Sequence, residues 1–158
     1  MIVREFERGD LGSMCEIWNG VFLEGIAFPQ EELLDIDSGY EFFKSQTLTS
    51  VAVEGDEVLG LYILHPNNVG RCAHIANASY AVSSSSRGRG IGERLVKDSL
   101  KKAKSRGFKV MQFNAVVETN PARRLYERLG FIQLGVIPKG FRLKNGEYAD
   151  ICPYCIEL

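Results

Sequence analysis

The chain has 158 residues, 45% of them apolar, and its 19 basic and 20 acidic side chains leave a net charge of −1. These values predict one globular domain, residues 1–158, and exclude the broad basic field of a dedicated nucleic-acid binder. Because no apolar run has the length of a membrane span or the pattern of a signal peptide, we expect a cytoplasmic protein with no nucleic-acid or membrane partner.

A strand and two helical regions are predicted first. Residues 2–6 predict the strand, and Asp10 is the expected N-cap of the helix that follows it. The apolar residues of this helix share one face: Leu11, Met14, Ile17, Trp18 and Val21. A second helical region is expected between Pro29 and Ser45, with an interruption at Ser38-Gly39. Its expected apolar anchors are Leu33, Leu34, Ile36, Phe42 and Phe43.

Three strands and a long helix follow. Residues 50–53 and 57–64 predict a β-hairpin, since a polar turn containing glycine joins two apolar runs. Residues 74–82 predict another strand. A helix is expected from Ile91 to Arg106, and Gly107 would end it. Its expected buried stripe consists of Ile91, Leu95, Leu100 and Ala103, with the lysines of the other side facing water.

The last third of the chain predicts a strand at residues 110–116 and a short helix. Asn120-Pro121 would start that helix, because asparagine is a good N-cap and proline suits the first helical position, and Gly130 would end it. Closing strands are expected at 131–137 and 147–156. The expected order is strand, two helices, three strands, helix, strand, helix and two strands.

The cysteines predict reduced thiols rather than a disulfide framework or a metal site. Cys152-Pro153-Tyr154-Cys155 is similar to a glutaredoxin active site. Such a motif uses a helix N-terminus to lower the pKa of the thiol, however, and only three residues follow Cys155. The motif therefore lacks the structural context for redox chemistry, and the spacing of Cys15 and Cys72 gives no repeated pair for zinc.

Six residues before the predicted long helix have the composition of an anion-binding loop: Arg87, Gly88, Arg89, Gly90, Ile91 and Gly92. Glycine lets the backbone approach a ligand closely, so the N–H groups at the helix start can point at phosphate oxygens. A Walker loop is excluded because Glu93-Arg94-Leu95 stands where it needs Gly-Lys-Ser/Thr. A dinucleotide fingerprint is excluded because its third glycine would fall on Glu93 or Leu95.

The remaining pattern, Arg87-x-x-Gly90-x-Gly92 before a helix, resembles the acyl-CoA pyrophosphate loop of the GCN5-related N-acetyltransferase (GNAT) superfamily. A second match follows in the expected order, from Asn120 to Phe131, with the sequence NPARRLYERLGF. The resemblance implies an α+β fold with three α/β/α layers. Its sheet would be mixed and mostly antiparallel, with about seven strands and about four flanking helices. Two central strands would splay apart and admit the pantetheine arm of the cofactor.

The resemblance also implies roles for particular residues. The loop from Arg87 to Gly92 would hold the pyrophosphate of acetyl-CoA, and the backbone of Val82 would meet the pantetheine arm. Asn120 would touch the same arm, although a helix N-cap explains this asparagine equally well. Tyr126 occupies the position of the general acid that protonates the leaving thiolate, and its alternative role is core packing. No metal is implied.

The reaction implied is direct attack of a primary amine on the thioester. Phosphinothricin-type relatives place a glutamate on the strand before the glycine loop, but this chain has Asn77 there, which cannot be a general base. Glu24, His74 and Glu118 are the candidates for that role.

The acceptor is expected to be a small amine, an amino acid or a peptide. The family builds the acceptor pocket from segments that correspond here to residues 24–32 and 138–147. A homodimer is compatible with the family. The alternatives are a non-catalytic acyl-CoA-binding module, which Asn77 motivates, and a nucleotide-binding protein that uses the same glycine loop.

Overall fold

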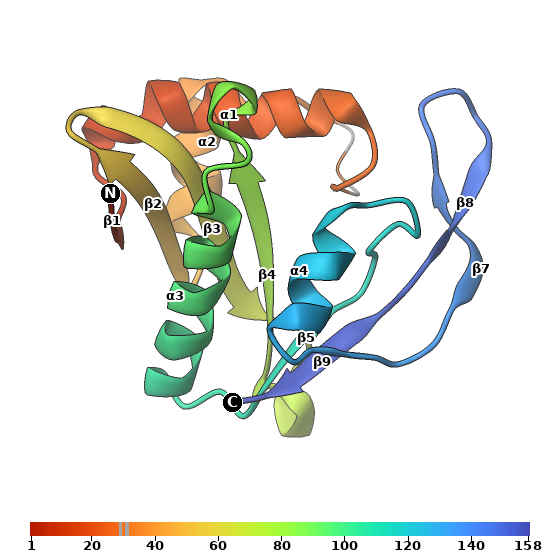
Figure 1. Ribbon diagram of the computed structural model, residues 1–158. Helices are drawn as coiled ribbons and strands as arrows, with labels where there is room; N and C mark the ends of the chain where they lie inside the picture. The colour runs from red at the N-terminus through yellow and green to blue at the C-terminus, as the bar shows by residue number, and fades with distance from the viewer. Residues whose placement is uncertain (29, 31) are drawn as a thin grey trace.

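A seven-stranded sheet forms the centre of the computed structural model, which describes residues 1–28, 30 and 32–158. In spatial order, its strands are β1 (Ile2–Glu5), β2 (Leu48–Glu54), β3 (Glu57–Pro66), β4 (Ile75–Val82), β5 (Val110–Phe113), β9 (Tyr154–Glu157) and β6 (Ile132–Gln133). The β4–β5 pair is parallel and the other pairs of this sheet are antiparallel. Strands β7 (Ile137–Arg142) and β8 (Tyr148–Ile151) form a separate ribbon that projects from the body of the molecule (Figure 1).

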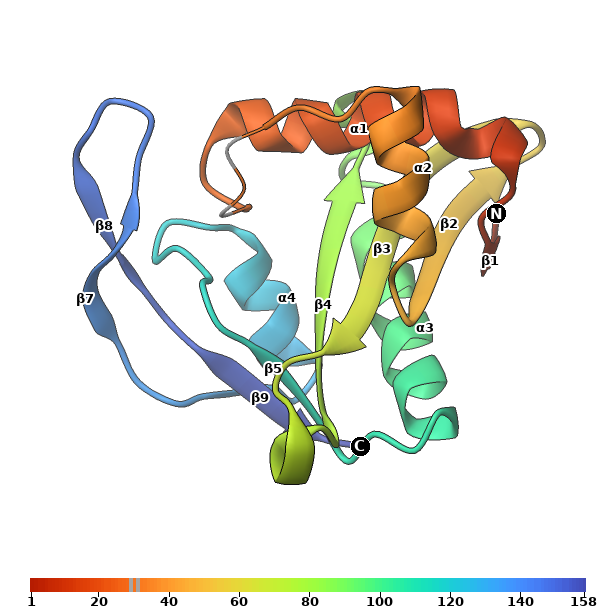
Figure 2. The ribbon, with the colours of Figure 1, turned by 180° about the vertical axis from the view of Figure 1, so that it is seen from behind.

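Helices cover both faces of the sheet. Helices α1 (Leu11–Glu24) and α2 (Ile36–Lys44) lie on one face, and α3 (Ile91–Ser105) and α4 (Ala122–Arg128) lie on the other (Figures 1 and 2). Short 3₁₀ turns occur at Arg8–Asp10, Gly70–Cys72 and Ser84–Ser86. The three α/β/α layers and the mostly antiparallel sheet confirm the predicted fold class. Within the described part of the chain, none of the helices is both long enough and apolar enough to span a membrane.

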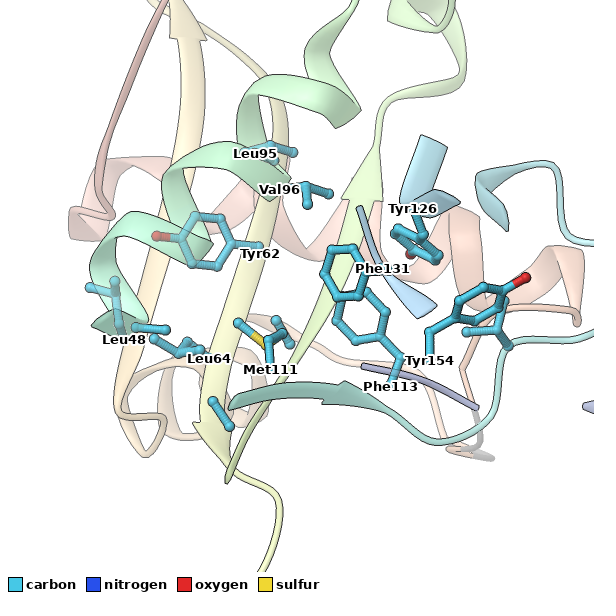
Figure 3. Packing of buried hydrophobic residues seen from close by; sticks show 14 of the residues in the cluster. Leu48, Tyr62, Leu64, Leu95, Val96, Met111, Phe113, Tyr126, Phe131 and Tyr154 are labelled. Atoms are coloured by element: carbon cyan, nitrogen blue, oxygen red, sulfur yellow. The ribbon is translucent and has the colours of Figure 1, made fainter. Parts of the chain in front are cut away.

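The central strands bury both of their faces, which explains their continuous apolar sequence. On β3, Leu61 and Ile63 pack toward α1 and α2, whereas Tyr62 and Leu64 pack toward α3. Each fully buried side chain of this size contributes roughly 1.5–3 kcal/mol relative to an exposed one. The Tyr62 hydroxyl donates a hydrogen bond to Asp98 on α3 (2.8 Å). Figure 3 shows the α3 side of this core, which continues into an aromatic group around Tyr126.

The predicted apolar face of α1 is confirmed. Asp10 stands at the predicted N-cap position, but its side chain makes no capping hydrogen bond to the helix. All five predicted residues of that face are buried. Asp10 has helical backbone angles, and its carboxylate instead accepts hydrogen bonds from Arg4 (2.7 and 3.0 Å) and from the Glu7 N–H (2.8 Å). The Arg4 guanidinium holds the pKa of Asp10 below its usual value. Asp10 thus fixes the chain between β1 and α1.

The second helical region is shorter than predicted and is not interrupted at Ser38-Gly39. Helix α2 starts at Ile36, where the Asp35 carboxylate accepts a hydrogen bond from the Ser38 N–H (2.7 Å). The preceding segment is held outside the helix because Asn19 on α1 bonds both the N–H and the carbonyl of Leu34. Two of the expected apolar anchors, Leu33 and Ile36, are exposed. Pro29, the predicted start, lies outside the described residues.

Gly39 lies inside α2 because the helix packs closely on α1. A Cβ atom at position 39 would clash with the Sγ of Cys15, a buried thiol held by a hydrogen bond to the Asp35 carbonyl (3.3 Å). We therefore expect Gly39→Ala to lower the free energy of unfolding by about 1–3 kcal/mol in urea titrations. In a Cys15→Ala background, the same change should be neutral or stabilising, because alanine favours helix over glycine. Equal losses in both backgrounds would contradict this contact.

The end of the chain differs most from the prediction. The single strand expected at 147–156 is two strands in two different sheets, since Pro153 has no N–H with which to continue a ladder. The strand expected at 131–137 contains only Ile132–Gln133, and residues 137–142, expected in a turn, form β7. Cys152 is buried at the break and Cys155 lies within β9, so extended chain replaces the helix that a redox motif requires.

Candidate functional site

Strands β4 and β5 separate soon after they meet, and this opening holds the candidate site. They pair at Ile75–Val110 and Ala76–Met111, and then diverge. A cavity of about 460 Å³ crosses the opening. Its wall comes from α1 and the segment after it, from β3, β4 and β5, from the start of α3 and from α4. The predicted splay between the two central strands is therefore present.

The glycine loop has the backbone that a phosphate cradle needs. Gly88 and Gly90 adopt left-handed conformations (φ 78° and 77°), which L side chains rarely adopt. Helix α3 starts directly afterwards, and the Arg94 N–H donates to the Gly90 carbonyl as the first bond of the helix. The N–H groups of Ile91, Gly92 and Glu93 come earlier in the chain than Arg94, so they have no carbonyl acceptor within the helix. Together with the positive end of the helix dipole, they can bind an anion.

The two arginines of this loop form ion pairs within the chain. Arg87 pairs with Glu24 at the end of α1, and Arg89 pairs with Glu54 at the end of β2. Arg87 and Glu24 both line the cavity. The Arg89 guanidinium lowers the pKa of the Glu54 carboxyl. A bound phosphate would therefore compete with carboxylates for these side chains, and the backbone N–H groups remain its unopposed partners.

Tyr126 is part of the core and of the cavity wall at once. Its ring lies beside those of Phe113, Phe131 and Tyr154, with centroid distances of 4.7, 5.6 and 6.0 Å (Figure 3). Burial raises the pKa of its phenol well above the usual value. The hydroxyl makes no hydrogen bond with any described residue, although the side chain lines the cavity. Both roles weighed for Tyr126 are thus compatible with its position.

The neighbouring tyrosines differ from Tyr126, because their hydroxyls are occupied. Tyr80, which also lines the cavity, shares a 2.7 Å hydrogen bond with Ser99. Tyr154 donates to Glu127 (2.8 Å) and accepts from Arg123 (2.9 Å). Of the tyrosines that line the cavity in the described part of the chain, Tyr126 is the one whose hydroxyl is available to a ligand.

Asn120 and Val82 both lie in the cavity wall, as expected for contacts with a cofactor arm. The Asn120 side-chain oxygen accepts a hydrogen bond from the Ala122 N–H (2.9 Å), which confirms the N-cap. Its amide nitrogen makes no hydrogen bond with a described residue and can donate to a ligand. Val82 is the last residue of β4, where the strand leads into the glycine loop. Of the candidate residues, Val82, Arg87, Gly92, Asn120 and Tyr126 therefore share one cavity. Gly88, Arg89 and Gly90 do not line it, and Ile91 is buried in the core beside α3.

A cluster of neutral amides lies where β4 and β5 begin to separate. Asn77 and Asn114 both donate to the side-chain oxygen of Asn67 (3.1 and 2.6 Å), and Gln112 donates to that of Asn114 (3.0 Å). We call Asn67, Asn77, Gln112 and Asn114 the amide cluster. Asn77 and Asn114 line the cavity. Asn77, which stands where a glutamate is expected in phosphinothricin-type relatives, thus belongs to an uncharged network.

Two of the three proposed general bases lie away from the cavity. His74 is exposed at the closed end of the β4–β5 pair, and Glu118 is exposed beyond β5; neither contributes to the cavity wall. Glu24 does contribute, but it is paired with Arg87. The sequence reasoning missed His65, which lies opposite Asn77 in the β3–β4 register and lines the cavity. Only that register could have identified it, because the two residues are twelve positions apart in the sequence.

Comparison with known proteins agrees with this geometry. Residues 12–131 match the sequence model described as the acetyltransferase (GNAT) family. The chain is 38% identical over 131 residues to N-acetyltransferase aca1 from Schizosaccharomyces pombe, a match that covers 72% of this chain and 63% of aca1. The chain thus spans less than two thirds of the length of that relative.

Solved structures share the whole fold. A GCN5-related N-acetyltransferase from Kribbella flavida has a TM-score of 0.91 and 32% identity, with coverage of 99% of this chain and 97% of that chain. A phosphinothricin acetyltransferase from Sinorhizobium meliloti, solved in complex with acetyl-CoA, also has a TM-score of 0.91, at 22% identity. That alignment covers 99% of this chain and 88% of the other.

Proposed function

The chain belongs to the acetyltransferase (GNAT) family, and from this premise we propose that residues 1–158 form one N-acetyltransferase domain. It would transfer the acetyl group of acetyl-CoA to a primary amine. The observation that carries this proposal is the continuous cavity that extends from the start of α3 to the free hydroxyl of Tyr126. Membership of the family indicates that acetyl-CoA is the acyl donor. The cavity has room for its thioester beside the Tyr126 hydroxyl, a proton donor.

The residues around the cavity fit acetyl-CoA. A Cβ atom added at Gly88 or Gly90 would meet nothing within 4 Å, so the loop leaves open space beside its N–H groups. Those N–H groups would hold the pyrophosphate, supplemented by Arg87 and Arg89. Val82 and Asn120 would hold the pantetheine arm along the opening between β4 and β5. Bound there, acetyl-CoA supplies an activated thioester.

Tyr126 would act as the general acid. A phenol is a weaker acid than a typical thiol, so the hydroxyl would hydrogen-bond the developing thiolate and give up its proton only as the carbon–sulfur bond breaks. The aromatic rings around Tyr126 fix its position and exclude water from one side. The amine must be neutral to attack. At pH 7, deprotonating a lysine-like amine costs about 4.6 kcal/mol, from roughly 3.4 pK units at 1.36 kcal/mol each.

The raised pKa of Tyr126 predicts how transfer depends on pH at the alkaline side. Since burial raises the pKa of this phenol above its ordinary value, the hydroxyl keeps its proton when the pH passes the range in which exposed tyrosines ionise, near ~10. We therefore expect kcat to show no loss between pH 7 and about pH 10 that is due to Tyr126. Steady-state measurements of kcat across this pH range test the expectation. A fall in kcat at alkaline pH that is absent from the Tyr126→Phe variant would contradict it.

For the acceptor, we propose a small amine, an amino acid or a peptide N-terminus. The amide cluster offers neutral donors and acceptors rather than a carboxylate that would hold an ammonium group. Of the segments expected to form the acceptor pocket, Ile26, Ala27 and Phe28 line the cavity, whereas Glu31 lies outside the described residues. The homodimer and the cytoplasmic location remain predictions.

The decisive experiment combines binding with turnover. Calorimetry should detect micromolar binding of acetyl-CoA, and release of free thiol should report transfer across a panel of amines that includes amino acids, polyamines and peptides. Tighter binding of ATP than of CoA would overturn the proposal in favour of a nucleotide-binding protein.

A non-catalytic acyl-CoA-binding module is the alternative, and Asn77 in place of the glutamate of phosphinothricin-type relatives favours it. The available hydroxyl of Tyr126 opposes it, because a module that only binds has no need of an unpartnered phenol in its cavity. Binding of acetyl-CoA without thiol release from any amine would support the module. Turnover that Tyr126→Phe abolishes would exclude it.

A further inference from the structure

His65 is the histidine of this chain that lines the cavity. It is the next to last residue of β3, is half-buried and lies opposite Asn77 of β4. In this register, His65 and Asn77 share the face of the sheet that carries Ile63 and Ser79, which also line the cavity. That face is the one covered by α1 and α2 farther along the strands. The imidazole is therefore placed beside the amide cluster, on the face opposite the aromatic group around Tyr126.

One hydrogen bond determines the tautomer of the His65 ring. Nδ1 lies 2.9 Å from the Pro66 carbonyl oxygen. A carbonyl can only accept, so Nδ1 must carry the hydrogen and donate it. In the neutral ring, the lone pair then belongs to Nε2, which makes no hydrogen bond with any residue that the structure describes. A backbone carbonyl that fixes Nδ1–H in this way leaves the other nitrogen as a base.

Among the described groups around His65, few could act as a base in its place. From β4 and β5 come the amides of Asn77, Gln112 and Asn114. From α1 and the glycine loop come Glu24 and Arg87, which neutralise each other. Tyr80 and Tyr126 are the ionisable hydroxyls of the cavity wall, and burial keeps both protonated.

Within the described part of the chain, β2 and α3, which also pack on β3, add no ionisable side chain to the cavity wall. Residues 48–53 of β2 carry no ionisable side chain. Asp98 on α3 accepts a hydrogen bond from the Tyr62 hydroxyl, and this pair lies on the face of the sheet opposite to His65.

Building on the proposed transfer reaction, we propose that His65 is the general base that deprotonates the acceptor amine. Nε2 takes one proton from the ammonium group, and the neutral nitrogen bonds to the acetyl carbon while the carbon–sulfur bond breaks. The sulfur receives the proton of Tyr126. After it bonds to the acetyl carbon, the former amine nitrogen gives up one more proton, which restores the Tyr126 hydroxyl. The imidazolium of His65 releases its proton to water. An ammonium ion and a thioester thus give an amide, a thiol and one proton.

The test compares His65→Gln with His74→Gln, since these are the two histidines of the chain. We expect His65→Gln to lower kcat/KM at pH 7 by about 10²- to 10⁴-fold, the range for loss of a general base. The loss should shrink as the pH rises above the pKa of the amine, because the amine then arrives neutral. His74→Gln, at an exposed position, should match the wild type at every pH. Both variants should bind acetyl-CoA as the wild type does, which calorimetry checks.

The outcomes separate this proposal from the broader one. A wild type that binds acetyl-CoA and acetylates no amine overturns both. A wild type that acetylates an amine, with His65→Gln matching its kcat/KM and pH profile, overturns the role of His65 alone. Imidazole added to a His65→Ala variant should restore part of the rate at pH 7. If the rate does not recover and the variant has also lost its affinity for acetyl-CoA, His65 has a structural role instead.

Discussion

Tyr126→Phe is expected to lower kcat for acetyl transfer by about 10²- to 10⁴-fold, the usual contribution of a general acid. The substitution removes one oxygen atom that has no hydrogen-bond partner among the described residues, and it keeps the ring that packs on Phe113 and Phe131. The variant should therefore fold as the wild type does and bind acetyl-CoA with an affinity changed by no more than about twofold. Thiol-release kinetics at saturating acetyl-CoA measure the loss.

The matched control is Tyr148→Phe, which makes the same chemical change on an exposed side chain of β8. It should leave kcat unchanged. A Tyr126→Phe variant that keeps the wild-type kcat would show that the thiolate leaves without help from this hydroxyl, and Tyr126 would then be a packing residue only. If KM for acetyl-CoA rises while kcat stays constant, the hydroxyl contributes to binding rather than to the chemical step.

Local sequence signals predicted the backbone features of the two motifs, while their role in binding a cofactor stays a prediction. The glycine loop needs left-handed backbone at Gly88 and Gly90, and the short helix needs the Asn120 cap; both requirements involve residues within a few positions of each other. Local features of this kind can be predicted from the sequence without knowing the fold. The aromatic surroundings of Tyr126 could not be read in the same way, since Phe113 and Tyr154 come from other strands.

The acceptor side depends on strand register, which local signals do not determine. His65 and His74 flank the same β3–β4 connection, since His65 lies near the end of β3 and His74 directly precedes β4. Only the pairing of His65 with Asn77, and the separation of β4 from β5 after Ala76, decide that one histidine lines the cavity and the other faces water. A one-residue shift in register would reverse the face on which each side chain lies.

The largest effect on the cofactor is expected from Gly90→Asp, which should weaken acetyl-CoA binding by more than about 100-fold, or roughly 2.7 kcal/mol. Position 90 directly precedes helix α3, where a carboxylate caps a helix well by accepting hydrogen bonds from its first N–H groups. These are the donors that the pyrophosphate needs, so the new side chain would both occupy them and repel the phosphates.

Gly107→Asp provides the matched control, because Gly107 is also left-handed (φ 89°), has open space around it and lies beyond the opposite end of the same helix. It introduces the same charge and a similar strain at a distance from the glycine loop, so acetyl-CoA affinity should stay at the wild-type value in calorimetry. Gly90→Ala adds the strain without the charge, and that strain is present in the free and bound protein alike. Its affinity should therefore lie close to the wild type, and a loss as large as that of Gly90→Asp would show that phosphate binding depends on the shape of the loop rather than on free N–H donors.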